Sequence, residues 1–90
     1  MYDTYAQNSS LGLSASTLIK AGSGRLSRIN VTTAGAAGAV YDSATVGGVS
    51  ASNLIAVIPA TVGQYQFDWP VANGLVYVPG SAQVASISWS

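Results

Sequence analysis

The 90-residue sequence contains no cysteine, no histidine and no glutamate. Without cysteine, neither a disulfide nor a thiolate metal site can add stability. Without histidine and glutamate, the groups left for acid–base chemistry are three aspartates, Lys20 and the tyrosines. A serine nucleophile would need Lys20 as its base, and we expect Lys20 to be a solvated strand end because a glycine-rich turn follows it. These absences predict a protein that is not an enzyme and has no catalytic residue and no cofactor.

Charge is also scarce, at 7% of residues, where an ordinary soluble domain has about 25%. The net charge is zero, whereas solubility usually requires a net charge of magnitude ~2–8. A chain this short also buries only about 60–65% of its unfolded surface, so its own core gives modest stability. The surface is either kept wet by neutral polar side chains or covered by other subunits. The second explanation accounts for both features and predicts a homo-oligomer.

The composition and the lack of long apolar runs disfavour several classes of partner. Three cations balanced by three anions cannot form the basic surface that nucleic-acid binding requires, so we expect no nucleic-acid partner. No apolar run approaches the ~18 residues of a membrane helix, and the first residues lack the pattern of a signal peptide, which favours cytoplasmic synthesis. We expect Arg25 and Arg28 to pair with Asp68 or Asp42 of the same chain or another.

Asp42 is the best candidate for a metal ligand, because carbonyl groups of the loop 43–48 could complete part of a calcium shell. No second carboxylate lies close to it in the sequence. We therefore predict no metal site, and expect Asp42 to accept nearby backbone N–H groups at a strand end.

Short apolar segments separated by glycine, proline and asparagine predict an all-β fold. We expect a small antiparallel β-sandwich or barrel of about seven short strands. An extended N-terminal arm, residues 1–13, would precede a single domain, residues 14–90. The predicted strands are 16–20, 25–33, 39–42, 54–58, 65–69, 75–78 and 84–89.

Local patterns add detail to this fold. The turn 21–24 predicts a hairpin between its flanking strands. Alternation places Ile29 and Val31 inward and Asn30 outward, and Leu26 is out of phase with that pair, which predicts a bulge near Ser27 or Arg28. In the last strand, alternation places Ala85, Ile87 and Trp89 on one face and Ser86 and Ser88 on the other. The segment 54–58 is apolar at every position, as in a strand covered on both sides. We expect Pro59 and Pro70 to end strands, and Asn73-Gly74 and Pro79-Gly80 to form turns with positive φ, the second of type II.

Aromatic residues are the candidate interaction residues. Alternation places Tyr65, Phe67 and Trp69 on one face of a strand, and with Tyr77 and Trp89 they form either a core or interface cluster or a platform for stacking sugars. Core or interface is favoured because aromatics dominate buried area. In the arm, tyrosines either dock on a neighbouring subunit or belong to a frayed end. The predicted interface residues are Tyr2, Tyr5, Tyr65, Phe67, Trp69 and Trp89.

Several segments carry a family resemblance: GRLSRINVTTAG (24–35), GAVYD (38–42), IPATVG (58–63), NGLVYVPG (73–80) and the terminal SISWS (86–90). Together they resemble small proteins encoded among the virion genes of tailed bacteriophages. The resemblance implies a structural protein that decorates or cements the capsid surface, or that forms the base of a head fibre or spike. It implies the major capsid protein or other virion subunits as partners, location in the virion, and a symmetric homo-oligomer, for which we expect a trimer. The alternative is a carbohydrate- or receptor-binding β module of a phage fibre or spike.

Overall fold

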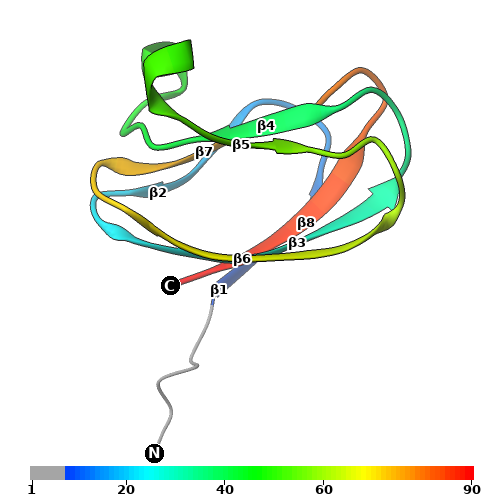
Figure 1. Ribbon diagram of the computed structural model, residues 1–90, viewed down its shortest axis with the longest axis horizontal. Helices are drawn as coiled ribbons and strands as arrows, with labels where there is room; N and C mark the ends of the chain where they lie inside the picture. The colour runs from blue at the N-terminus through cyan, green and yellow to red at the C-terminus, as the bar shows by residue number, and fades with distance from the viewer. Residues whose placement is uncertain (1–7) are drawn as a thin grey trace, which may run out of the picture.

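The computed structural model describes residues 8–90, which form two packed four-stranded antiparallel sheets (Figure 1). Sheet A has the strand order β1-β8-β3-β6, and sheet B has the order β2-β7-β4-β5. The predicted small all-β sandwich is confirmed, with eight strands rather than about seven. The strands are β1 (Asn8–Leu13), β2 (Thr17–Ala21), β3 (Gly24–Thr33), β4 (Gly38–Tyr41), β5 (Leu54–Ile58), β6 (Gly63–Val71), β7 (Gly74–Val78) and β8 (Val84–Trp89).

The additional strand comes from the segment predicted to be an arm. Residues 1–13 were expected to precede the domain, but Asn8–Leu13 pairs with β8 and forms one edge of sheet A. Its sequence, NSSLGL, has too few apolar residues to mark a strand by alternation, so pairing with β8 decides its conformation. Tyr2 and Tyr5 lie outside the described residues.

The chain changes sheet at nearly every connection. Among the described strands, β4 and β5 are the one pair that is both consecutive in sequence and hydrogen-bonded. The predicted hairpin at residues 21–24 is therefore wrong, because β2 pairs with β7 in sheet B while β3 pairs with β6 and β8 in sheet A. The turn passes from one sheet to the other, with Gly22 at a φ of 89°. A glycine-rich turn permits a sharp change of direction but does not determine which strand pairs next.

The inner faces of the two sheets form the core. Ile29 and Val31 of β3 are buried and Asn30 is exposed, as alternation predicted. Leu26 is also fully buried, and the pairing of β3 with both neighbours shifts between Leu26 and Arg28. This confirms the predicted bulge, which returns Leu26 to the inward face. In β8, Ala85 and Ile87, which alternation places on one face, are both buried.

Strand β6 continues past the point where proline was expected to end it. Pro70 lies inside β6 opposite Arg25, and the strand ends at Val71. Proline is tolerated here because β6 is the edge of sheet A, where one side of the strand needs no N–H donor. Asp68 has a φ of 51°, and two residues of β6, Phe67 and Asp68, lie opposite Ser27 of β3. The resulting bulge breaks the alternation and leaves Trp69 54% exposed.

Two glycines were predicted to have positive φ and do not. Gly74 and Gly80 both have ordinary backbone angles, so the predicted turn types are wrong. Glycine is required at both positions for close backbone approach instead: a Cβ on Gly74 would collide with the carbonyl oxygen of Ser43, and one on Gly80 with that of Ala36. The turn after Pro79 spans residues 80–83, and Ala82 has the positive φ, 64°.

A buried polar side chain closes one end of the core. Gln83 is 1% exposed, its Oε1 accepts hydrogen bonds from the Tyr77 hydroxyl at 2.6 Å and the Gly80 N–H at 3.3 Å, and its Nε2 donates to the Pro59 carbonyl at 2.9 Å. Burial raises the pKa of Tyr77. These bonds tie the ends of β5 and β7 to the start of β8, so glutamine has a structural role here.

Candidate functional site

The aromatic residues predicted from the sequence do not form one exposed platform. Tyr65, Phe67 and Trp89 are partly buried and pack against the core. Tyr77 is fully buried, and Trp69 is largely exposed. The Tyr65 hydroxyl donates to the Thr61 carbonyl at 2.7 Å. The surfaces that could bind a partner are therefore the outer faces of the two sheets.

The outer face of sheet B is apolar across all four strands. Strand register places Leu18 beside Val76, Val76 beside Tyr41, and Tyr41 beside Leu54. Val76 is flanked by Leu18 and Tyr41 in this row and is buried, although it points away from the core. A second row has Val78, Ala39 and Val57 in register. We call this surface the apolar face; its members are Leu18, Ala39, Tyr41, Leu54, Val57, Val76 and Val78.

Strand β5 contributes the most exposed part of the apolar face. It lies at the edge of sheet B, and Val57 is 61% exposed. The pairing of β4 with β5 skips Ile55, so that Ile55 and Ala56 both pack against the core while Leu54 points outward. Within the single chain only the inner face of this strand is covered, and cover of its outer face by a second subunit stays a prediction.

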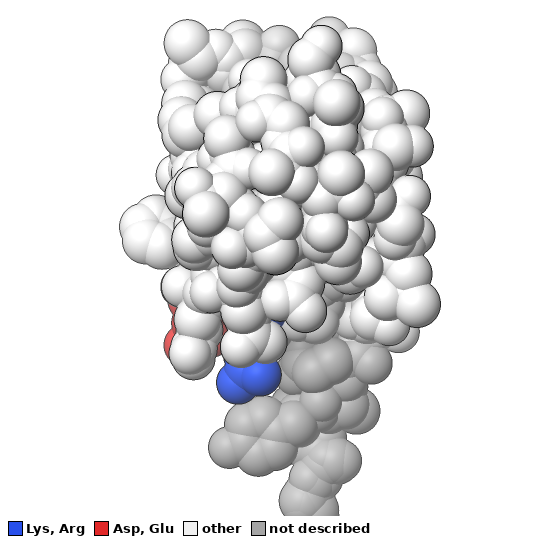
Figure 2. Space-filling view, turned by 90° about the vertical axis from the view of Figure 1, so that its right-hand side faces the viewer, with Lys and Arg blue, Asp and Glu red and all other residues white. Residues whose placement is uncertain are grey.

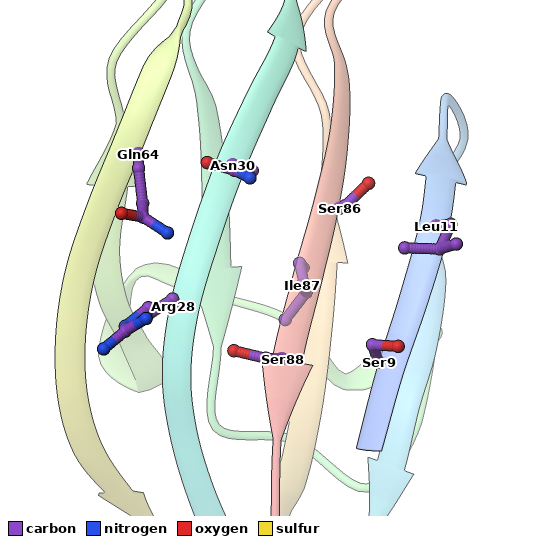
Figure 3. Close-up of a pocket in the computed structure, with 8 residues that line it drawn as sticks. All are labelled: Ser9, Leu11, Arg28, Asn30, Gln64, Ser86, Ile87 and Ser88. Atoms are coloured by element: carbon purple, nitrogen blue, oxygen red, sulfur yellow. The ribbon is translucent and has the colours of Figure 1, made fainter. Parts of the chain in front are cut away.

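The outer face of sheet A differs in being polar. Four strands of sheet A line a hollow of about 220 Å³ in this face (Figure 3). Hydroxyl and amide groups and one guanidinium surround it. We call it the polar hollow; its lining residues are Ser9, Leu11, Arg28, Asn30, Gln64, Ser86, Ile87 and Ser88.

The charged side chains of the described residues all lie off the apolar face. Figure 2 shows the right-hand end of the sandwich with sheet B uppermost, and coloured charged groups are visible only low in the view, on the side of sheet A. The Arg25 Nη1 is 3.0 Å from the Asp68 Oδ1, which is one of the ion pairs expected from the sequence. The Lys20 Nζ lies over the Trp89 ring, 5.8 Å from its centroid, in a cation–π contact.

Asp42 has a structural position. Its two carboxylate oxygens accept N–H groups from Ala72 (3.0 Å), Asn73 (2.8 Å) and Gly74 (3.2 Å). Desolvation alone would raise the pKa of Asp42, but the three backbone hydrogen bonds outweigh it and lower the pKa below its ordinary value. These donors are 30 to 32 residues away in the sequence rather than nearby, so the carboxylate joins the end of β4 to the β6–β7 connection.

Within residues 8–90, no group of three or more potential metal-ligating side chains is gathered in one place. The same residues include no helix with the length and hydrophobicity needed to cross a membrane. Comparisons of the chain with protein-family models, curated proteins and solved structures gave no match.

Proposed function

We propose that this chain is a structural, non-catalytic virion protein that self-associates through the apolar face of sheet B. The observation that supports this proposal is the contrast between the two outer faces. Sheet B presents Leu54 and Val57 to solvent, whereas the equivalent surface of sheet A presents Arg28, Asn30 and serine hydroxyls. A β-sandwich with no use for its second apolar face would be expected to have polar side chains there.

A second copy of the chain is the occupant that fits this face best. The apolar face carries no charged side chain that would select a charged partner, and a copy offers an identical apolar surface. The edge strand β5, which adjoins it, has neither a charge nor an internal proline to prevent contact with another chain. Self-association would cover the face and the edge together.

The size of the face indicates how strong this contact is. Four strands about 4.8 Å apart and two rows of side chains give an area of roughly 300 Å². A stable interface usually buries ~800 Å² per partner, so one such contact is weak by itself. Many weak contacts become strong in a symmetric shell, because each subunit already bound raises the effective concentration of the next site. A capsid provides such repetition.

The family resemblance supplies the virion context. Under this proposal the chain decorates or cements the capsid as a homo-oligomer, with a cyclic trimer as the expected symmetry and the major capsid protein or another virion subunit as its partner. Its effect is passive: added buried surface stabilises the assembled shell by mass action. The alternative of an aromatic sugar-stacking module lacks an exposed aromatic platform in residues 8–90.

The interface is tested by placing one lysine on each outer face. Val57→Lys on sheet B should abolish self-association measured by light scattering, because a buried lysine would have no partner. Leu11→Lys is the matched control, since Leu11 is 74% exposed on the opposite sheet. Equal association of both variants would overturn the assignment of the interface.

The virion role is tested separately by mass spectrometry of density-purified particles of a phage whose genome encodes the chain. We expect the chain in the particles at a fixed ratio to the major capsid protein. Its presence in infected cells but absence from such particles would refute the virion role while leaving the interface untouched.

A further inference from the structure

We propose that the polar hollow on sheet A binds the acidic sugar residue of a saccharide, with Arg28 holding the sugar carboxylate. The site is distinct from the apolar face, because it lies on the opposite sheet of the sandwich. It therefore stays accessible when sheet B is buried in an assembly. The inference does not depend on the virion role.

Arg28 is the first reason for this assignment. It is exposed on the outer face of β3, and within residues 8–90 its guanidinium has neither an ion pair nor a hydrogen bond. Arg25, three residues earlier, is paired with Asp68. Arginine presents a planar fork of donors that matches a carboxylate, and a fork with no acceptor among the described residues is available for an anionic ligand.

The neutral lining is the second reason. Figure 3 shows Arg28 and Gln64 between β3 and β6, Ser88 pointing from β8 towards β3, and Ser86 pointing towards β1. Amide and hydroxyl groups both donate and accept hydrogen bonds, as the ring hydroxyls of a sugar require. Leu11, at the other side of the hollow, provides apolar surface for the C–H groups of a ring.

The shape of the site favours a sugar over an acidic peptide. Pockets for drug-sized ligands enclose ~300–1,000 Å³, so about 220 Å³ suits a single ring. The hollow runs across the paired strands of a sheet, where backbone groups of β3 and β8 are already used in the ladder. A peptide that binds by strand addition needs a free sheet edge instead.

The test is a titration of the ¹⁵N-labelled protein with D-glucuronate, followed by NMR. We expect shifts concentrated at the side-chain N–H groups of Arg28, Asn30 and Gln64, with affinity about tenfold weaker for D-glucose, which lacks the carboxylate. Arg28→Gln should weaken glucuronate binding about tenfold. The matched control, Arg25→Gln, should leave it unchanged, because Arg25 points to Asp68 outside the hollow.

A second variant, Asn30→Ala, keeps the test decisive if Arg28→Gln does not fold. Asn30→Ala removes an exposed amide from the hollow and should also weaken glucuronate binding while the fold is retained. The proposal is overturned if glucuronate causes no shifts, or if glucose or acetate binds as well as glucuronate. It is also overturned if a folded Arg28→Gln or Asn30→Ala variant binds normally, or if a glutamate-rich peptide binds where glucuronate does not.

Discussion

Replacement of Gln83 by leucine should be one of the most damaging single changes in this fold. The glutamine is buried and satisfies three separate groups: the Tyr77 hydroxyl, the Gly80 N–H and the Pro59 carbonyl. Leucine has a similar size and fills the space, so the effect of the change is confined mainly to hydrogen bonding.

The expected magnitude follows from the groups left without partners. Each buried polar group that loses its only partner costs roughly 1–3 kcal/mol, so the three groups together give about 3–9 kcal/mol for Gln83→Leu. Tyr77→Phe removes one hydrogen bond and leaves Gln83 Oε1 with the Gly80 N–H, so it should cost only about 0.5–1.5 kcal/mol. Domains of this size have a total stability of roughly 5–14 kcal/mol, so Gln83→Leu would remove a large fraction of it.

A double-mutant cycle in chemical denaturation measures this network. In the Gln83→Leu background, Tyr77→Phe removes an unsatisfied hydroxyl and should be neutral or stabilising. A coupling free energy of about 1 kcal/mol or more is expected between the two positions. If Gln83→Leu costs under ~1 kcal/mol and the two changes are additive, the network does not contribute as described.

Three further outcomes are expected. The lowered pKa of Asp42 contributes stability that is present above the pKa of an unfolded aspartate, ~3.9, and is lost as pH falls through the lower pKa of the folded state. Asp42→Asn should therefore reduce the loss of melting temperature at acidic pH, and should cost about 1–2 kcal/mol of stability at neutral pH. Gly80→Ala should destabilise by about 1–3 kcal/mol through collision with the Ala36 carbonyl, whereas Gly47→Ala, in open space, should be nearly neutral in the same denaturation assay. The melting temperature should vary little between about pH 5 and pH 9, because the chain has no histidine; a steep change would show a strongly shifted aspartate or lysine.

The sequence predicted those features that depend on neighbouring side chains. The burial of Ile29 and Val31, the exposure of Asn30 and the bulge beside Leu26 all follow from the period of two along one strand. The alternation of β8 was equally informative. Each of these features is recorded in consecutive residues and needs no knowledge of the partner strand.

Features that depend on distant segments were missed. Gly74 and Gly80 mark close approaches to Ser43 and Ala36, and a glycine in the sequence does not distinguish this requirement from a positive φ. Pro70 is tolerated only because β6 is an edge strand, which is a property of the sheet order.

The two surfaces were only partly predictable. The polar outward positions of β3 and β8, such as Asn30 and Ser86, were visible as alternation. The apolar face was also signalled, because β4, β5 and β7 are apolar at outward and inward positions alike. The pattern predicted a strand apolar on both faces, and the structure shows both faces apolar with only the inner one covered within the chain. The polar hollow combines four strands and had no local signal.

Sedimentation equilibrium of the unmodified protein, from the micromolar to the millimolar range, tests self-association most directly. The weak apolar face predicts an average mass that rises with concentration above the 9.1 kDa of one chain, towards the mass of a trimer. Convergence on a dimer would correct only the symmetry. A folded species that stays at 9.1 kDa over the whole range would contradict the proposed self-association.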